Sequence, residues 1–193
     1  MSDIKSRKLQ AKILRLFRKI HRVTGATLFL FFAIIAITGI LLGWKNVSNG
    51  AILPISQTGT SKNLSEWISI DQLHKKAITV LQDSISNTIS LELSRIDIRK
   101  EKGMVKFIFE DHLWEVQLDG ATGNLLQLQK RHSDFFENLH DGTILDKAFG
   151  TNKLFKVLYT SIMGLALMLF TVTGFWLWYG PKKLKKKKLL KNN

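Results

Sequence analysis

The sequence predicts a membrane protein in which two transmembrane α-helices flank a small extracytoplasmic α+β domain. Two uncharged apolar runs, residues 23–44 and 157–180, are each long enough to cross a hydrocarbon core of about 30 Å at 1.5 Å per residue. Between them, one segment with helical apolar spacing precedes stretches in which apolar and polar residues alternate. This order indicates one helix packed on an antiparallel sheet, carried between two membrane spans.

The excess positive charge lies at both ends of the chain. The formal net charge is +14, of which residues 1–22 and residues 180–193 each carry +7. Basic tails can indicate nucleic-acid binding, but each of these adjoins an apolar run. Because Lys and Arg near the ends of spans stay on the cytoplasmic side, we expect both termini inside, residues 45–156 outside, and no nucleic-acid partner. The tails are then attracted to the anionic lipid of the bilayer.

The first apolar run is longer than the apolar core of a secretory signal and is followed by no A-x-A-like cleavage site, so a retained anchor is expected. The chain contains no cysteine. Disulfides, cysteine-ligated clusters and haem attached through C-x-x-C-H are therefore excluded, and any redox cofactor would be held non-covalently.

The stretch "SIDQLHKKAITVLQD" predicts an amphipathic helix after a Ser-, Asn- and Gly-rich linker at 45–63. Ser69 and Gln72 have the spacing of a capping box. His74 lies beside the apolar stripe with lysines next to it, so a solvated surface histidine is expected. The residues of the apolar stripe are Ile70, Leu73, Ala77 and Leu81.

Three alternating stretches, "SRIDIRK", "MVKFIFE" and "LWEVQLDG", predict strands of an antiparallel meander. The intervening "EKG", "ED" and "DGATG" supply turn residues. We expect one sheet face to be buried beneath the helix. The residues on the three predicted apolar faces are Ile96 and Ile98, then Val105, Phe107 and Phe109, then Trp114, Val116 and Leu118.

These motifs together resemble the PepSY domain and its associated transmembrane family. "HLWEVQLDGATGNLL", with Asp119, Thr122 and Gly123, looks like the PepSY signature. "IHRVTG" and "AITGILLGW" around the first span, with "NLHDG" and "TVTGFWLWYGPKK" around the second, are similar to the associated spans. The resemblance covers residues 16–182 and identifies the chain as a short two-span member. It implies a bacterial inner-membrane location with residues 45–156 in the periplasm.

Larger members of that family have further spans, and some are implicated in haem-dependent reduction of ferric siderophores outside the inner membrane. The resemblance therefore implies haem b as a cofactor, ferric iron or a ferric siderophore as a substrate, and a ferric-reductase-like oxidoreductase activity in support of iron uptake. The alternative is a non-enzymatic, membrane-anchored interaction module or an accessory subunit of an envelope uptake complex. The sequence contains no flavin or nicotinamide fingerprint, which favours the alternative.

His21 is the first candidate haem ligand. It shares a helix face with Gly25, and a glycine next to a histidine leaves space that a porphyrin edge could fill. The other interpretation is an interfacial cation beside Arg18, Lys19 and Arg22, with the glycine permitting close helix packing. The family's H-x-x-x-G pattern makes the two interpretations about equal.

His140 is the second candidate. Ser133 is expected to cap a short helix on which His132, Phe136 and His140 follow at intervals of four. The alternative is an amphipathic segment whose phenylalanines insert into the bilayer. The family's "LH-x-G" pattern favours His140 as a haem ligand, whereas His132 is not expected to be one.

A haem iron with two axial histidines needs them on opposite faces of the ring. His21 and His140 are expected near opposite membrane faces, about 30 Å apart, so they cannot share one haem. Each would need a partner from a second copy of the chain or from a partner membrane subunit. A homodimer would form a four-helix bundle with one haem near each membrane face. The small residues that could permit such association are Ala36, Gly39 and Gly43 in the first span and Thr160, Gly164, Thr171 and Gly174 in the second.

These sequence patterns predict that the chain consists of seven parts. The expected parts are a basic cytoplasmic tail at 1–22, a transmembrane helix at 23–44, a linker at 45–63, a PepSY-like domain at 64–131, an interfacial segment at 132–156, a second transmembrane helix at 157–180 and a basic cytoplasmic tail at 181–193.

Overall fold

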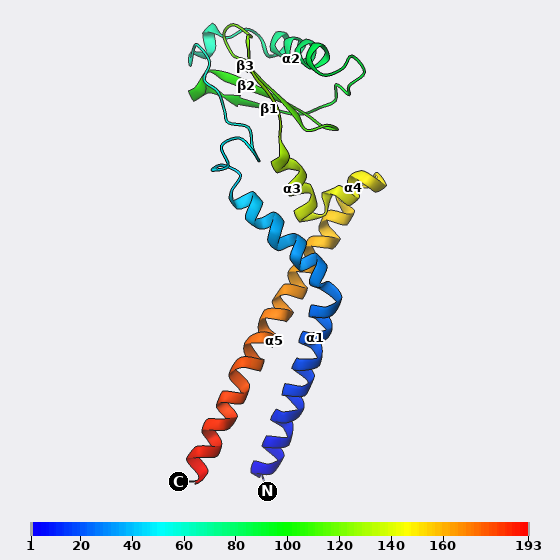
Figure 1. The fold of residues 1–193 in the computed structure, drawn as a ribbon, viewed down its shortest axis with the longest axis vertical. Coiled ribbons are helices and arrows are strands. Elements are labelled where there is room, and N and C mark those ends of the chain that lie inside the picture. Colours follow the sequence, from blue (N-terminus) through cyan, green and yellow to red (C-terminus); the bar gives the residue numbers. More distant parts are fainter. Residues whose placement is uncertain (1, 193) are drawn as a thin grey trace. The chain divides into compact units, whose positions relative to one another are not determined.

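A computed structural model describes residues 2–192, with side chains for residues 8–183. The chain divides into two compact units (Figure 1). One unit consists of residues 1–37 and 139–193 and contains most of the two long helices. The other, residues 38–138, contains the sheet.

The two-helix unit is built on α1 (Ser2–Gly43) and α5 (Leu154–Asn192), whose chain termini lie at the same end of the unit (Figure 1). Both helices are long and apolar enough to cross a membrane. Large apolar side chains such as Phe29 and Leu165 are 66% and 63% exposed along them. Exposed apolar surface of this extent is typical of a helix that contacts a membrane or another protein. The α1 helix also includes the basic N-terminal segment, which the sequence pattern separates from the span.

Two short helices, α3 (His132–Asp141) and α4 (Thr143–Phe149), precede α5. The expected cap at Ser133 is wrong, because α3 already begins at His132. The backbone amide of Ser133 instead donates to the carbonyl oxygen of Ile52, at 2.8 Å. This hydrogen bond ties the start of α3 to the segment that follows α1.

The sheet unit confirms the predicted α+β domain. Helix α2 (Ile70–Ser84) lies across a four-stranded antiparallel sheet of order β1-β2-β3-β4 (Figure 1). Ser69 caps α2: its hydroxyl oxygen accepts a hydrogen bond from the backbone amide of Gln72 at 3.2 Å. The strands are β1 (Leu93–Arg99), β2 (Met104–Phe109), β3 (Trp114–Asp119) and β4 (Leu125–Lys130), and two short 3₁₀ turns are η1 (Leu64–Glu66) and η2 (Lys100–Lys102).

The core lies between α2 and one face of the sheet, as the periodicity predicts. Apolar residues at helical spacing on α2 meet alternate residues of β2 and β3, and all of these side chains are almost completely buried. Burying side chains of this size stabilises the fold by about 1.5–3 kcal/mol for each Leu, Val or Phe. The core residues are Leu73, Ala77, Leu81, Val105, Phe107, Phe109, Val116 and Leu118.

The second face of the sheet is covered by residues 50–61, hereafter the covering segment. This segment lies inside the predicted linker, but it is bonded to the sheet. The side-chain oxygen of Gln117 accepts a hydrogen bond from the backbone amide of Gln57 at 2.9 Å. The side-chain amide of Gln117 donates to the backbone carbonyl of Ile55, also at 2.9 Å. Gly59 donates to the carbonyl of Lys102, at 2.7 Å. A β-carbon at Gly59 would lie 2.1 Å from the Gly103 carbonyl oxygen, so only glycine fits this close backbone approach.

The face beneath the covering segment carries a buried ionic network centred on Glu115, whose side chain is 0% exposed. Its carboxylate accepts from Lys106 at 2.9 Å, from Gln117 at 2.6 Å and from Arg131. Arg131 also forms an ion pair with Asp134, with Nε 3.1 Å from Oδ2. Since every charge in this network has an opposite partner, the polar face can be buried without a stranded ion.

His74 is not the solvated histidine that the sequence predicts. Its ring stacks on Phe107 with centroids 5.7 Å apart, and its Nε2 atom is buried without a hydrogen-bond partner. His74 precedes the core residues Ala77 and Leu81 by three and seven positions, which places it at the border of the same helix face. His112 is also partly buried, with Nε2 2.9 Å from the carbonyl oxygen of Ser90.

Asp119 joins the covering segment to the turn after β3. Its carboxylate accepts from the amide and hydroxyl of Thr60, at 2.8 and 3.1 Å, and from the amides of Ala121 and Thr122, at 2.8 and 3.1 Å. Burial alone would raise the pKa of Asp119, but these donors together hold it below the ordinary value of about 3.9. Since the carboxylate is bonded only in the folded state, its contribution to stability is present above about pH 4 and is lost as pH falls through the lower folded-state pKa.

We therefore expect Asp119→Ala to free the covering segment at neutral pH, at a cost of about 2–3 kcal/mol. Hydrogen exchange of the full-length protein in nanodiscs should show faster exchange in residues 50–61. Acidification of the wild-type protein through the lowered folded-state pKa of Asp119 should produce the same change. The exposed Asp83→Asn variant is the control and should exchange as wild type. Equal protection of residues 50–61 in Asp119→Ala and wild type would contradict the assignment.

Candidate functional site

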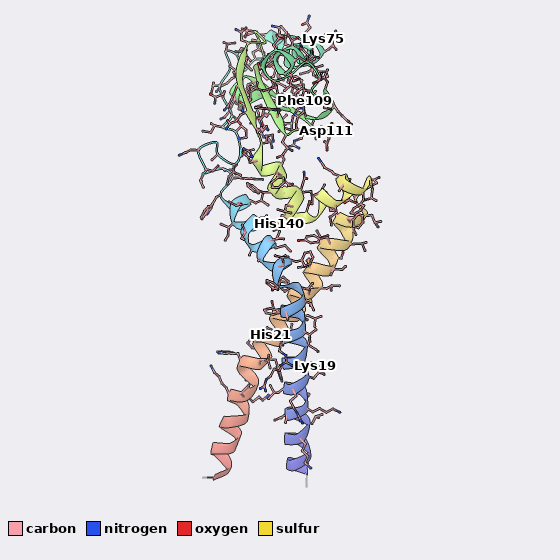
Figure 2. The ribbon with its side chains drawn as sticks, turned by 45° about the vertical axis from the view of Figure 1, so that its right-hand side comes forward. Lys19, His21, Lys75, Phe109, Asp111 and His140 are labelled. Carbon is pink, nitrogen blue, oxygen red and sulfur yellow. The ribbon has the colours of Figure 1, made fainter. Side chains whose placement is uncertain are left out.

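Both candidate histidines belong to the two-helix unit (Figure 2). His21 lies on α1 and faces α5. Its Nδ1 is 3.0 Å from the hydroxyl oxygen of Thr173, and its ring stacks on Phe170 with centroids 3.8 Å apart and planes inclined by 23°. A β-carbon at Gly174 would lie 3.3 Å from the ring carbon Cε1. The ring therefore packs against residues 170–174, which form about one turn of α5.

The hydroxyl of Thr173 has His21 and two backbone carbonyls within hydrogen-bond distance. It lies 2.7 Å from the carbonyl oxygen of Leu169 and 3.1 Å from that of Phe170. When its single hydrogen points to one of these carbonyls, the hydroxyl oxygen can accept a hydrogen bond from Nδ1 of His21. The tautomer with the proton on Nδ1 has its lone pair on Nε2, an atom that can bind a metal.

The space beside Gly25 is filled by a side chain of the same unit. A β-carbon at Gly25 would lie 3.0 Å from the ring carbon Cε2 of Phe170. Phe170 thus occupies the gap that the sequence assigned to a porphyrin edge, and Gly25 permits close packing of the helices. A cofactor at His21 would have to approach from a side that Phe170 does not cover.

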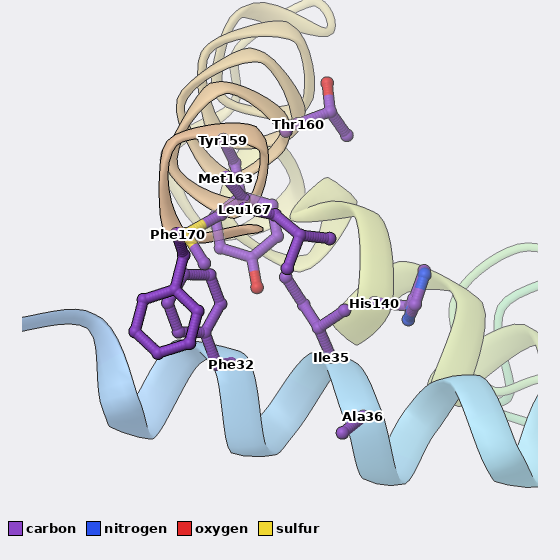
Figure 3. Close-up of a pocket in the computed structure, with 10 residues that line it drawn as sticks. Phe32, Ile35, Ala36, His140, Tyr159, Thr160, Met163, Leu167 and Phe170 are labelled. Carbon is purple, nitrogen blue, oxygen red and sulfur yellow. The ribbon is translucent and has the colours of Figure 1, made fainter. Parts of the chain in front are cut away.

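His140 lines an apolar cavity of about 550 Å³ between α1 and α5 (Figure 3). Phe32, Ile35 and Ala36 of α1 form one wall. Gly164 leaves room on the α5 side, because no atom lies within 4 Å of the position of a β-carbon there. The other lining residues, all on α5, are Tyr159, Thr160, Met163, Leu167 and Phe170.

A network at the start of α5 holds the residues that follow His140. The carboxylate of Asp141 accepts from Lys156 at 2.5 Å and from the hydroxyl of Thr143 at 2.6 Å. Burial would raise the pKa of Asp141, but the bonds from Lys156 and Thr143 hold it below its usual range. Gly142 has φ +81° and a β-carbon there would be 2.9 Å from Tyr159, so glycine is required. The "HDG" stretch thus positions His140 at the cavity.

The described side chains do not bring His21 and His140 together. Thr173, beside His21, and Tyr159, beside His140, are 14 positions apart on α5, or about 20 Å along the helix. His132 is exposed and lines neither site. Among residues 8–183, no three His, Asp or Glu side chains are close enough to hold a metal ion. The sequence motifs do not identify Thr173 and Phe170 as contacts of His21. The "TVTG" stretch nevertheless lies where α5 contacts His21.

An antiparallel α+β domain and two helices long and apolar enough to cross a membrane are the features of a membrane protein. Residues 3–180 match the family model described as the PepSY-associated TM region, and the chain belongs to that family. This confirms the resemblance seen in the sequence motifs. Comparison with curated proteins and with solved structures gave no match.

Proposed function

We propose that this PepSY-family membrane protein binds haem b through His21 and His140 and transfers electrons that reduce ferric iron or a ferric siderophore in the periplasm. The main support is the position of His21, whose Nδ1 lies 3.0 Å from the hydroxyl oxygen of Thr173, so that Nε2 is the nitrogen not in this contact. Bound haem would supply one-electron transfer.

The residues at His140 fit a porphyrin. A large, flat and mostly apolar ring needs an apolar cavity with a ligand at its edge, and the cavity beside His140 has both features. Thr160 and Tyr159 add hydroxyl groups to the lining. The network of Asp141 and Lys156 restricts the backbone that carries His140, which reduces the entropy lost on ligation.

A second copy of the chain would complete both sites. Low-spin haem takes two axial ligands, and each site has one histidine among the described residues. The exposed apolar surfaces of α1 and α5 and the open position at Gly164 are suited to helix association in lipid. We propose a homodimer, or a complex with a related membrane subunit, in the inner membrane with both termini cytoplasmic.

The test is the visible absorption spectrum of detergent-purified protein before and after addition of dithionite, with haem supplied during expression. We expect a Soret band whose α and β bands sharpen on reduction, at one haem per chain in total. His21→Ala and His140→Ala should each halve this content, since each removes one of two sites. His132→Ala is the matched control and should leave it unchanged. A featureless spectrum from folded protein would contradict the proposal and favour an anchored interaction module.

A further inference from the structure

A second cavity, of about 300 Å³, lies at the end of the two-helix unit that carries the chain termini. It is separate from the cavity at His140 and shares no residue with it. Its apolar wall is formed by Leu9, Ile13 and Leu14 of α1 together with Trp176 of α5. Gln10 and Lys183 supply its polar groups.

The cavity adjoins a point of close contact between the helices. A β-carbon at Gly180 would lie 2.8 Å from a methyl carbon of Leu14, so the helices approach closely there. Pro181 follows within α5 and has no amide hydrogen, so the helical hydrogen bond to the carbonyl of Leu177 cannot form. Trp176 is also in edge contact with Phe17, with ring centroids 6.2 Å apart. These contacts fix one boundary of the cavity.

The two helix segments that line the cavity carry basic residues and no acidic ones. Residues 8–22 and 176–183 contain Lys and Arg but no Asp or Glu. Lys183 lines the cavity, and the ammonium of Lys182 lies 3.7 Å from the centre of the Trp178 ring. Indole rings prefer the membrane interface, so this level of the helices corresponds to the lipid headgroups. A ligand here meets an apolar wall and the side chain of Lys183, with Lys182 as the neighbouring residue on α5.

We propose that this cavity is a binding site for an anionic phospholipid, with part of an acyl chain against Ile13 and Trp176 and the phosphate near Lys182 and Lys183. Charge complementarity selects an anionic headgroup, because two ammonium groups have no acidic neighbour in either segment. The apolar wall favours a lipid over a nucleic acid, which would present no acyl chain to it. This site would bind one lipid molecule in a defined position. The general attraction of basic tails to an anionic bilayer surface fixes no lipid in position.

The test is native mass spectrometry of the full-length protein titrated with phosphatidylglycerol or with phosphatidylcholine of the same acyl chains. We expect tighter binding of phosphatidylglycerol, and a loss of roughly tenfold or more in that preference in the double variant Lys182→Gln/Lys183→Gln. The charge-matched control is Lys62→Gln/Lys100→Gln, which removes two exposed lysines of the sheet unit and should bind as wild type.

A second set of variants tests the cavity itself without altering charge. Ile13→Trp should fill the space and lower phosphatidylglycerol affinity several-fold, and Leu9→Phe provides the same test if the first variant does not fold. Phosphatidylglycerol binding that equals phosphatidylcholine binding, or that survives both filling variants, would overturn the proposal. An equal loss in the control would show net charge alone to be responsible, and would overturn it as well.

Discussion

Replacement of Glu115 by alanine is expected to destabilise the sheet unit by about 3–5 kcal/mol, a large part of the stability of a small domain. Glu115 is fully buried and accepts from Lys106, Gln117 and Arg131. Arg131 would keep Asp134 as a partner, but Lys106, whose side chain is 3% exposed, would lose the carboxylate that neutralises it. The cost arises from this stranded charge, not from a lost attraction alone.

Thermal unfolding and hydrogen exchange of β2 and β3 in the full-length protein measure this effect. Glu101→Ala, which removes a carboxylate whose side chain is 85% exposed, is the control and should change stability by less than about 0.5 kcal/mol. The double variant Lys106→Met/Glu115→Leu should recover most of the loss, because it removes both charges at once. If Glu115→Ala unfolds at the wild-type temperature, the network does not stabilise the fold.

Replacement of Gly164 by phenylalanine is expected to abolish haem binding at His140 while leaving the site at His21. The glycine borders the cavity of about 550 Å³, and nothing lies within 4 Å of its β-carbon position, so the new ring would occupy space that the proposed cofactor needs. Haem content per chain should fall by about half, as in His140→Ala. The side chain of His140 itself is unchanged, so this variant separates loss of space from loss of the ligand.

The matched control is Leu165→Phe, which places the same ring one position along α5, at a side chain that is 63% exposed. Its haem content should equal that of wild type. Combining Gly164→Phe with His21→Ala should remove the remaining haem. Full haem content in Gly164→Phe would show that the cavity is not the cofactor site, even if haem is bound elsewhere.

The local elements of the sheet unit could be predicted because each is defined by a short-range pattern. The spacing of Leu73, Ala77 and Leu81 gives one apolar helix face, and alternation in β2 and β3 gives one apolar sheet face. These faces can be buried only against each other. The sequence predicts the covering segment to be part of a linker. Its packing on the sheet leaves no periodic pattern in the sequence, because its hydrogen bonds run to side chains about 60 residues away.

The candidate site was predicted only in part. Histidines at 21 and 140 could be selected from motifs, but their environments depend on which turn of α5 faces α1. Gly25 looked like space for a cofactor, yet Phe170 fills it. Thr173, whose hydroxyl contacts Nδ1 of His21, is one of several threonines in an apolar run and carries no distinguishing local signal.

Two membrane-length helices, an amphipathic helix and alternating strands follow from local sequence patterns, because hydrophobic periodicity and charge depend on neighbouring residues alone. The places of the polar residues depend on long-range packing. It buried the ionic network of Glu115 and turned His74 onto Phe107. It also joined His21 to Thr173 across 152 positions. A buried polar group must find a partner wherever the fold brings one, and that partner is set by long-range packing.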